Sequence, residues 1–523
     1  MDSLKSVLIV GRHPITDVVV RQYATRDFSV IRYEQARCYG ESPDEIFIAT
    51  LPHPGESVIE DMRNIAILRQ ICSKADMARP FRCHILFHSH QVYNQFQNDN
   101  FCVDLKEVAE IYTFTEATLW AQCIFTLLPG QKSRFPFTER IPQSVDSDET
   151  VHIVIFGFND MTEVLAQYAA LTCHYANYTR DHSLRTRITI VDENAAEVMY
   201  GFTNRHKSLF DNSYYRLVDL KQMQGVCVRE FHSPDYDEVR EDCVDIEWEF
   251  VNGGLWSEVL RNKLRSWAND EFQFLSVIIG YETDDKNISS AFEVSKEVSG
   301  RNIPILVKVT SLEILKLISG ADGLMPYGMK TADYDIYEPL NSMAAMVNYV
   351  YECCYEDNYQ KGNYSEEVFS PVSIDIAEAE LLWKNLSYSK RLSNIYNAMT
   401  IPIKMRSLGH SQEDWAAFYA MSGKDISLLA EMEHNRWNVA VLLLGYRPVN
   451  DEQEKEIESN ISLKKEYRDK MIHYDIRSYK DLRPDGSGRN ANTYDRCLAA
   501  AIPLIAKTFI TDIADGSDDV HIR

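Results

Sequence analysis

An apolar run that ends in glycine occurs twice in this chain, and it is the feature that most restricts the possible folds. Residues 6–11 read SVLIVG, and residues 150–157 read TVHIVIFG. Each run is followed by a segment of helix length and then by further apolar runs separated by polar or helical sequence. Strands that alternate with helices form a parallel, doubly wound sheet. We therefore predict an α/β fold with two Rossmann-like units in tandem.

The length of the chain, 523 residues, is too great for one hydrophobic core. The apolar runs place a degenerate Rossmann-like domain at 1–142 and a Rossmann-like nucleotide-binding domain at 143–330. Helical periodicity replaces the strand pattern after that, so we expect an all-α linker region at 331–425. Three motif-like stretches near the C-terminus set the bounds of a small helical domain at 426–513. Residues 514–523 form a C-terminal tail.

Charge and cysteine usage exclude several classes of protein. The net charge is −24 and there is no long basic run, which argues against nucleic acid as a partner. The apolar run near the N-terminus, 7–10, is too short for a signal peptide or a membrane span. The 11 cysteines contain no CxxC pair, as expected for reduced, buried thiols. We expect a cytoplasmic protein.

Three histidines in the stretch CHILFHSHQ raise the question of a metal site. His84, His88 and His90 lie in and just after a strand-like run. The spacing of the first two, four residues along a strand, is not the pattern of a structural zinc motif. We therefore expect no metal.

The turn after the first strand of each unit is where a Rossmann fold binds phosphate, through backbone N–H groups at a helix N-terminus. In the second unit Gly157 is present, whereas Asn159 and Thr162 occupy the second and third glycine positions. Asp192 ends the next strand, where an acidic residue holds ribose hydroxyls. The candidate nucleotide-binding residues lie at the ends of three strands: Gly157, Asn159, Asp160, Met161, Asp192, Gly280, Tyr281 and Glu282.

The first unit is further from the dinucleotide pattern, because Gly11 is soon followed by Pro14 in GRHPIT. The alternative interpretation of both units is a Rossmann scaffold retained for assembly.

The second unit resembles the nucleotide-binding regulatory domain of potassium-channel and transporter regulators, the RCK (TrkA-N-like) type. The resemblance lies in VIFGFNDMTEVLAQYA, ITIVDEN and SVIIGYETDDKNISSAFEV, and the segment from Phe202 to Asn269 looks like an insertion. It implies a domain that senses a ligand, an adenine nucleotide or NAD(H), and that assembles as a homodimer.

Helical spacing marks the core of the region that follows. Its apolar positions recur every three to four residues: Leu382, Leu386, Leu392, Ile395, Met399 and Ile403. Pro402 predicts a bend or a break. The arrangement is similar to the linker of bacterial proteins that join such regulatory domains to a ryanodine-receptor (RyR) domain.

Three separated stretches near the C-terminus occur in one order: LAEMEHNRWNVAVLLLGYRP, KMIHYDIRSYKDL and NTYDRCLAAAIPLI. Residues 426–512 resemble the RyR domain, a small helical module repeated in calcium-release channels and single in bacteria. The family pattern falls on polar, aromatic and glycine positions: Glu433, His434, Arg436, Trp437, Gly445, Tyr446, Lys470, His473, Asp495 and Arg496. The chain departs from it at Tyr474, where proline is usual, and in the longer, more charged segment 451–469.

Two interpretations of these residues stay open. In the first, Glu433, Arg436 and Asp495 form a buried network, with Arg436 paired to Asp495 so that the first helix is joined to the last. The second is a pocket for a small anionic, nucleotide-like ligand, lined by aromatic and basic side chains: His434, Trp437, Tyr446, Lys470 and Arg496. No nucleophile, base and orienting residue occur together, so we expect no catalytic residues.

These expectations favour a regulatory sensor that binds a nucleotide-derived ligand through its Rossmann-like or RyR domain and signals by a change of shape. The resemblance to bacterial proteins suggests a role in anti-phage or conflict signalling. One alternative is a cytosolic gating subunit of a separate membrane channel. Another is an NAD-dependent enzyme, which the missing glycines disfavour.

Overall fold

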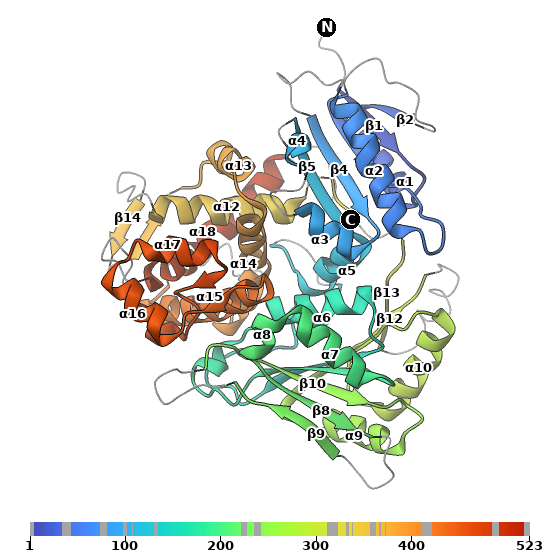
Figure 1. The fold of residues 1–523 in the computed structure, drawn as a ribbon, viewed down its shortest axis with the longest axis vertical. Helices are drawn as coiled ribbons and strands as arrows, with labels where there is room; N and C mark the ends of the chain where they lie inside the picture. Colours follow the sequence, from blue (N-terminus) through green and yellow to red (C-terminus); the bar gives the residue numbers. More distant parts are fainter. Residues whose placement is uncertain are drawn as a thin grey trace.

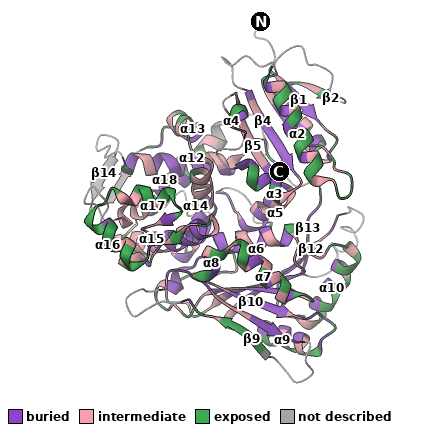
Figure 2. Cartoon of the chain, in the orientation of Figure 1, coloured by how far each residue is buried: buried purple, intermediate pink, exposed green. Residues whose placement is uncertain are grey.

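The computed structural model describes residues 5–33, 43–73, 81–97, 102–106, 108–129, 134–220, 227–234, 242–310, 323–330, 334–336, 338–355, 362–365, 368–371, 373–410, 421–483 and 491–516. They form two α/β units and one helical unit that pack together (Figure 1). The predicted α/β fold with tandem Rossmann-like sheets and a helical C-terminal part is confirmed. Burial is concentrated on the strands of both sheets and on the inner faces of the helices (Figure 2).

The first unit is a five-stranded parallel sheet in the order β2-β1-β3-β4-β5. Its strands are β1 (Ser6–Val10), β2 (Ser29–Tyr33), β3 (Glu45–Ile48), β4 (Phe81–Phe87) and β5 (Ala109–Thr115). Its helices are α1 (Ile15–Ala24), α2 (Ser57–Cys72), α3 (His90–Gln97), α4 (Val103–Lys106) and α5 (Glu116–Phe125). Strands such as β4 read as continuous apolar runs because helices or connecting segments cover both of their faces.

The second unit is an eight-stranded sheet in the order β13-β12-β11-β6-β7-β10-β8-β9. Its strands are β6 (Thr150–Phe156), β7 (Thr186–Asp192), β8 (Tyr214–Asp219), β9 (Cys227–His232), β10 (Ile246–Asn252), β11 (Gln273–Ile279), β12 (Ile305–Lys308) and β13 (Leu324–Tyr327). Its main helices are α6 (Asp160–Thr172), α7 (Ala195–Arg205), α8 (Lys207–Asp211), α9 (Glu258–Asn269) and α10 (Asp284–Glu297). All neighbours are parallel except β8 and β9.

The expected insertion from Phe202 to Asn269 is wrong in part. This segment contains β10, which pairs directly with β7 and is therefore the third strand of the Rossmann core. Only β8 and β9 extend the sheet beyond it, as an antiparallel edge. The segment therefore contains one core strand and an added pair of strands. The sequence pattern did not identify β10 as a core strand, because the order of strands in a sheet depends on pairing between distant residues.

The helical unit is built on four long helices: α12 (Pro339–Tyr355), α14 (Tyr388–Ser407), α15 (Gly423–Leu443) and α18 (Asn492–Gly516). Smaller elements surround them: α13 (Ile376–Lys384), α16 (Asp451–Ser459), α17 (Leu463–Asp469), the strand pair β14 (Gly362–Ser365) and β15 (Val368–Pro371), and the two-residue strands β16 (Arg447–Pro448) and β17 (Ile472–His473). Helix α12 contacts α14 and α18, and α15 contacts the same two helices. The stretch expected as an all-α linker contains the antiparallel pair β14 and β15, so that prediction is wrong in this detail, since strand pairing has no helical periodicity to reveal it. This stretch and the one expected as the RyR domain pack as one unit.

Local sequence sets the ends of these helices. The Ser422 hydroxyl accepts a hydrogen bond from the Asp425 amide at 3.2 Å, and the Asp425 carboxylate accepts one from the Ser422 amide at 3.2 Å. This capping box starts α15 at Gly423. Pro402 lies inside α14, which runs on to Ser407, so the proline does not end the helix.

A short connection from the second sheet to the helical unit lies against the first sheet. Tyr334 and Ile336 are buried in the apolar cluster on one face of that sheet. Gln22 of α1 donates to the Tyr334 carbonyl at 2.8 Å and accepts from the Ile336 amide at 3.1 Å. A separate cluster fills the opposite face. The largest cluster runs from the second sheet into the helical bundle, so these two units share one core.

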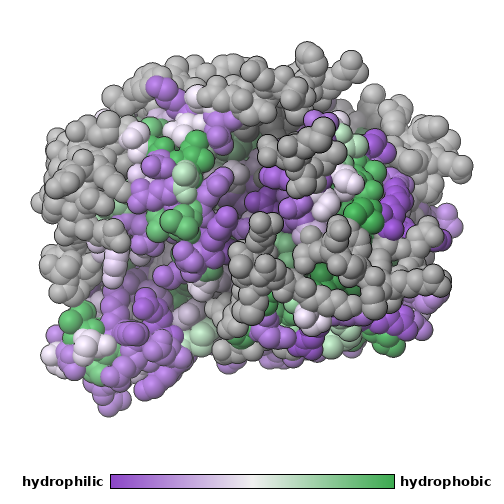
Figure 3. Space-filling view, turned by 90° about the horizontal axis from the view of Figure 1, so that it is seen from above, coloured by the Kyte–Doolittle hydropathy of each residue, from purple (hydrophilic) through white to green (hydrophobic). Residues whose placement is uncertain are grey.

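Two polar contacts also join the helical unit to its neighbours. The hydroxyls of Tyr388 on α14 and Tyr93 on α3 are 3.1 Å apart, and Asn438 on α15 donates to the Cys243 carbonyl at 3.2 Å. Among the described residues visible from above, hydrophilic side chains predominate and apolar ones form small patches (Figure 3).

Candidate functional site

The helices of the helical unit line an open groove with a volume of ≈ 1040 Å³. Its walls come from α12, α14, α15 and α18, while α17 and the residues on either side of it close one end. A volume of this size accommodates a small organic ligand. Because α12 and α14 belong to the stretch expected as a linker, the groove exists only where that stretch meets the RyR-like stretch.

Aromatic rings line this groove on two sides. On one side the ring of Tyr494 on α18 lies 5.5 Å from that of Tyr351 and 6.2 Å from that of Tyr355, both on α12. On the other side Trp437 on α15 meets His473 edge to face, with ring centroids 4.8 Å apart. Trp437 is only partly buried. Two such aromatic surfaces suit a ligand with a flat ring.

Positive charge gathers at the end of the groove formed by α17. Lys464, Lys465 and Arg468 line it, and Lys390 of α14 is a fourth cation among the lining residues of the groove. Lys464 is partly neutralised, because its ammonium lies 2.8 Å from the Asp475 carboxylate. Lys465, Arg468 and Lys390 are exposed. Cationic side chains of this kind bind phosphate groups, so one end of the groove is suited to a phosphate and its middle to a ring.

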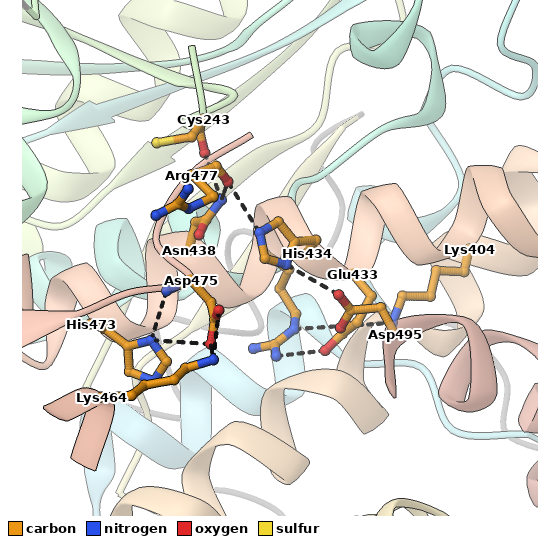
Figure 4. Close-up of polar contacts among 11 residues, drawn as sticks. Cys243, Lys404, Glu433, His434, Asn438, Lys464, His473, Asp475, Arg477 and Asp495 are labelled. Carbon is orange, nitrogen blue, oxygen red and sulfur yellow. Dashed lines mark hydrogen bonds and ion pairs between the residues drawn. The ribbon is translucent and has the colours of Figure 1, made fainter. Parts of the chain in front are cut away.

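A buried ion network includes Glu433, which is one of the lining residues of the groove, and Figure 4 shows its contacts. Arg436 donates two hydrogen bonds to the Glu433 carboxylate, from Nε at 3.0 Å and from Nη2 at 2.7 Å. Lys404 on α14 donates to the same carboxylate at 2.7 Å. All three side chains are at most 3% exposed. Burial alone would raise the pKa of Glu433, but the two cations outweigh it and lower that pKa to about 2.

The predicted pair between Arg436 and Asp495 is wrong. Arg436 bonds to Glu433, three residues earlier on the same helix, and Glu433 joins α15 to α14 through Lys404. Asp495 bonds instead to His434, with Nδ1 of the ring 3.1 Å from Oδ2. The expectation that a buried network joins these helices holds, with different partners. Glu433 lies one helix turn from Arg436 and was therefore the nearer partner for its guanidinium. Nothing in the sequence indicated that Lys404 would contact the same carboxylate.

His434 links α15 to α18 and to the loop that carries Arg477. The other ring nitrogen of His434, Nε2, lies 3.1 Å from the Arg477 carbonyl oxygen, which can only accept. Nε2 therefore carries a proton, and Nδ1 faces a carboxyl oxygen at 3.1 Å. A hydrogen bond there needs a second proton, on either the ring or the carboxyl group. Burial raises the pKa of Asp495, whereas the bond to His434 lowers it. Both residues line the groove.

The remaining residues expected in the RyR pocket divide between the groove and its outside. Tyr446 lines the groove and lies 5.9 Å from the His473 ring. Lys470 is exposed, with its ammonium 5.5 Å from the Tyr467 ring, and it does not line the groove. Arg496 points to α15, where it donates to the Ser427 hydroxyl at 2.6 Å.

Sequence reasoning missed half of the groove. The tyrosines of α12 and the cations of α17 were not predicted, although each has a signal. Tyr351 and Tyr355 are four residues apart, which places them on one face of a helix, and residues 463–470 read LKKEYRDK. Both signals lie outside the RyR motifs, so the resemblance did not point to them.

The predicted nucleotide-binding residues of the second unit do come together at the carboxyl ends of β6, β7 and β11. Gly157 ends β6 with φ +79°, and a Cβ there would lie 2.6 Å from the Tyr281 ring, so Tyr281 packs directly on this glycine. Asn159 donates to the Gly280 carbonyl at 2.5 Å. The Asp192 carboxylate accepts from the Asn194 amide at 2.8 Å. Glu282 follows Tyr281 in the adjoining turn.

The phosphate-binding end of α6 is already hydrogen-bonded. The Asn159 side chain accepts from the amides of Met161 at 3.1 Å and Thr162 at 3.3 Å, which are groups that would otherwise bind phosphate. Acidic side chains surround the turn, because Asp160 starts α6 and Asp192 stands at the end of β7. Burial raises the pKa of Tyr281, and the carboxylate of Asp192 raises it further. These features disfavour a phosphate here.

The histidines considered for a metal have other environments. His84 bonds to the Tyr334 hydroxyl at 2.6 Å, and burial lowers the pKa of His88 and of His90. Within the described ranges, no three histidine, cysteine or acidic side chains are grouped as metal ligands. No helix in that part of the chain has the length and apolar character to cross a bilayer.

Comparison with known proteins adds little. No protein-family profile and no curated protein matches the chain. Among solved structures it is similar to GsuK bound to ADP, with 13% identity over 62% of this chain and 66% of that chain, just under two thirds, and a TM-score of 0.28. It is also similar to the NAD-complexed D-isomer specific 2-hydroxyacid dehydrogenase from Lactobacillus delbrueckii ssp. bulgaricus, with 10% identity over 63% of this chain and 92% of that chain, and a TM-score of 0.20. Likenesses this slight carry no argument about ligands.

Acid is expected to weaken the helical unit in two steps. Burial lowers the pKa of His473 from 6.5 to about 4, so the folded ring stays neutral while an unfolded one takes a proton. The stability that this gives is lost as the pH falls from about 6.5 to about 4. For Glu433 the pKa is lowered from 4.5 to about 2, so its contribution is present above about pH 4.5 and lost below it. Urea unfolding of the full chain, followed across this pH range, measures both steps.

The His473→Gln variant serves as the control for the upper step, because glutamine has no proton to gain. We expect its unfolding midpoint to fall less than that of the parent chain between about pH 6.5 and about pH 4. Equal slopes for the two proteins in that window would contradict the assignment to His473.

Proposed function

We propose that this chain is a regulatory sensor that binds a nucleotide-like small anion in the groove of its helical unit, and that this unit is of the RyR type. The observation that carries the proposal is the combination of two aromatic surfaces with a cluster of cations in one groove of ≈ 1040 Å³. A base stacked on an aromatic side chain gains about 1–3 kcal/mol. Lysine and arginine at the α17 end of the groove bind the phosphate.

Opposite ends of the ligand then have different partners. The ring stacks between Trp437 and the tyrosines of α12, Tyr351 and Tyr355, while the phosphate lies toward Lys465 and Arg468. For the same ligand, we prefer the groove to the turn between β6 and α6 of the second unit. The first amides of α6, which would bind a phosphate there, are already hydrogen-bonded to the Asn159 side chain. Acidic side chains repel phosphate at that turn, whereas the groove end is basic.

The location of the groove suggests how binding is signalled. Helix α14 forms one wall of the groove, and its Tyr388 contacts Tyr93 of the first unit. Helix α15 forms another wall, and its Asn438 contacts Cys243 of the second unit. A ligand that draws the walls together therefore acts on the packing of both α/β units. A role in anti-phage or conflict signalling remains part of the proposal, on the resemblance alone.

Isothermal titration calorimetry of the full chain tests the proposal. The probes are ADP, ATP and ADP-ribose, with adenosine and inorganic phosphate as the two half-ligands. We expect at least one nucleotide to bind more than about 10-fold more tightly than either half-ligand, because only the whole molecule contacts both the rings and the cations. Raising the salt concentration should weaken this binding, since phosphate contacts are screened. A nucleotide that binds no better than phosphate, or none that binds, contradicts the proposal.

A further inference from the structure

Two cysteines from distant parts of the sequence meet in the core of the helical unit. The Sγ atom of Cys354 on α12 lies 2.9 Å from the Sγ atom of Cys497 on α18, although the two residues are 143 positions apart in the chain. Both are thiols, and they are 3% and 0% exposed. A disulfide has its sulfur atoms about 2.05 Å apart, so these two need to approach by only about another 0.9 Å.

The cysteine pair is carried by the same two helices as the tyrosines on one side of the groove. Cys354 is flanked along α12 by Tyr351 and Tyr355, three residues before it and one after. Cys497 follows Tyr494 on α18 by three residues and precedes Leu498. These flanking residues line the groove, and the Tyr351 and Tyr494 rings are 5.5 Å apart. Neither cysteine lines the groove itself, so the thiol pair is separated from the groove by these neighbouring side chains.

We propose that Cys354 and Cys497 are a site of reversible oxidation, at which a peroxide converts the two thiols into a disulfide that ties α12 to α18. The peroxide first oxidises the less buried Cys354 sulfur to a sulfenic acid, as its O–O bond breaks and one water leaves. The Cys497 sulfur then attacks the sulfenic sulfur, the S–S bond forms and the hydroxyl leaves as a second water. One hydrogen peroxide is reduced for each disulfide formed.

The two sulfur atoms lie where two helices are already in contact. Helices α12 and α18 already pack against each other, and the sulfur atoms already face each other across their contact. The disulfide would enclose α13 to α17 in one covalent loop and fix the spacing of the tyrosines on α12 and α18. Any effect of that spacing on nucleotide affinity rests on the proposed function. The formation of the disulfide is independent of the proposed function.

The test is thiol mapping of the full chain after treatment with hydrogen peroxide. Remaining thiols are alkylated in denaturant, and digested peptides are analysed by mass spectrometry with and without dithiothreitol. We expect a peptide pair that joins Cys354 to Cys497 in most of the chains and that dithiothreitol separates. Cys353→Ser is the matched control, because Cys353 is adjacent on α12 and 5% exposed, and this variant should give the same cross-link.

Other results of the thiol mapping would contradict the proposed disulfide. The inference is overturned if Cys354 and Cys497 remain alkylatable after oxidation, are oxidised without joining, or join other cysteines instead. The parent chain alone gives this answer, so it does not depend on whether Cys354→Ser or Cys497→Ser folds. Calorimetry on the oxidised and reduced chains then separates the two proposals. If the disulfide forms but the protein binds no nucleotide, the oxidation site is supported and the proposed sensor function is contradicted. If the protein binds nucleotide but no disulfide forms, the sensor function is supported and the oxidation site is contradicted.

Discussion

Replacing Glu433 with glutamine is expected to destabilise the helical unit by about 3–5 kcal/mol, because it leaves two buried cations without their carboxylate. Lys404 and Arg436 are 3% and 1% exposed, and both donate to Glu433 in the parent chain. Urea unfolding of the full chain gives the loss of stability. Hydrogen exchange on α14 and α15 shows that the loss is in this unit, because amides there should lose protection before those of the two sheets.

Two further variants make this test specific. Glu380→Gln removes an exposed carboxylate on α13, and we expect a change within about 0.5 kcal/mol. The triple variant Lys404→Met, Glu433→Met, Arg436→Met removes all three charges and should recover most of the stability, because apolar side chains replace the whole network. A Glu433→Gln chain that unfolds like the parent would show that the network is not sealed from water.

The fold was largely predictable because its signals are local. Apolar runs that alternate with helical segments identified both parallel sheets, and the glycine that ends β6 marked the turn correctly. The role of β10 was not predictable in the same way. Its place beside β7 is set by pairing between residues about 60 positions apart, as for Ile246 and Thr186.

The candidate site was predictable only in the half that lies within residues 426–513. Trp437 and Tyr446 line the groove as expected, because the motif carried them. The other half lies on α12 and α14, and the division of the chain at residue 425 separated these helices from the motif. Nothing in the sequence marks Lys404 as buried, since a lysine in a helix is normally exposed. A charged residue at that position becomes informative only when the structure places it against Glu433.

The predicted nucleotide turn shows a different limit of sequence reasoning. The residues expected there do lie close together, but the side chain of Asn159 accepts the hydrogen bonds of the Met161 and Thr162 amides. A polar residue in the second glycine position can hold a phosphate-binding turn open or cap the helix. Only side-chain geometry separates these two outcomes, and here it gives the cap.

Replacing Trp437 with alanine is expected to weaken nucleotide binding by roughly 10- to 100-fold, because it removes one of the two aromatic surfaces of the groove. The lost stacking corresponds to about 1–3 kcal/mol. Trp437 is only partly buried and meets His473 at 4.8 Å, so the alanine variant should keep its fold with a small loss of stability. Calorimetric titration with the tightest nucleotide measures the change, and circular dichroism confirms that the helices are retained.

The choice of control variants decides where the ligand lies. Lys470→Gln removes an exposed cation that does not line the groove, and its affinity should stay within about twofold of the parent value. Asp192→Ala removes the acidic residue at the end of β7, the position at which a Rossmann fold would hold ribose. If the groove is the site, this variant binds nucleotide as the parent does. If instead Asp192→Ala abolishes binding and Trp437→Ala leaves it unchanged, the ligand binds in the second sheet, and the groove has another role.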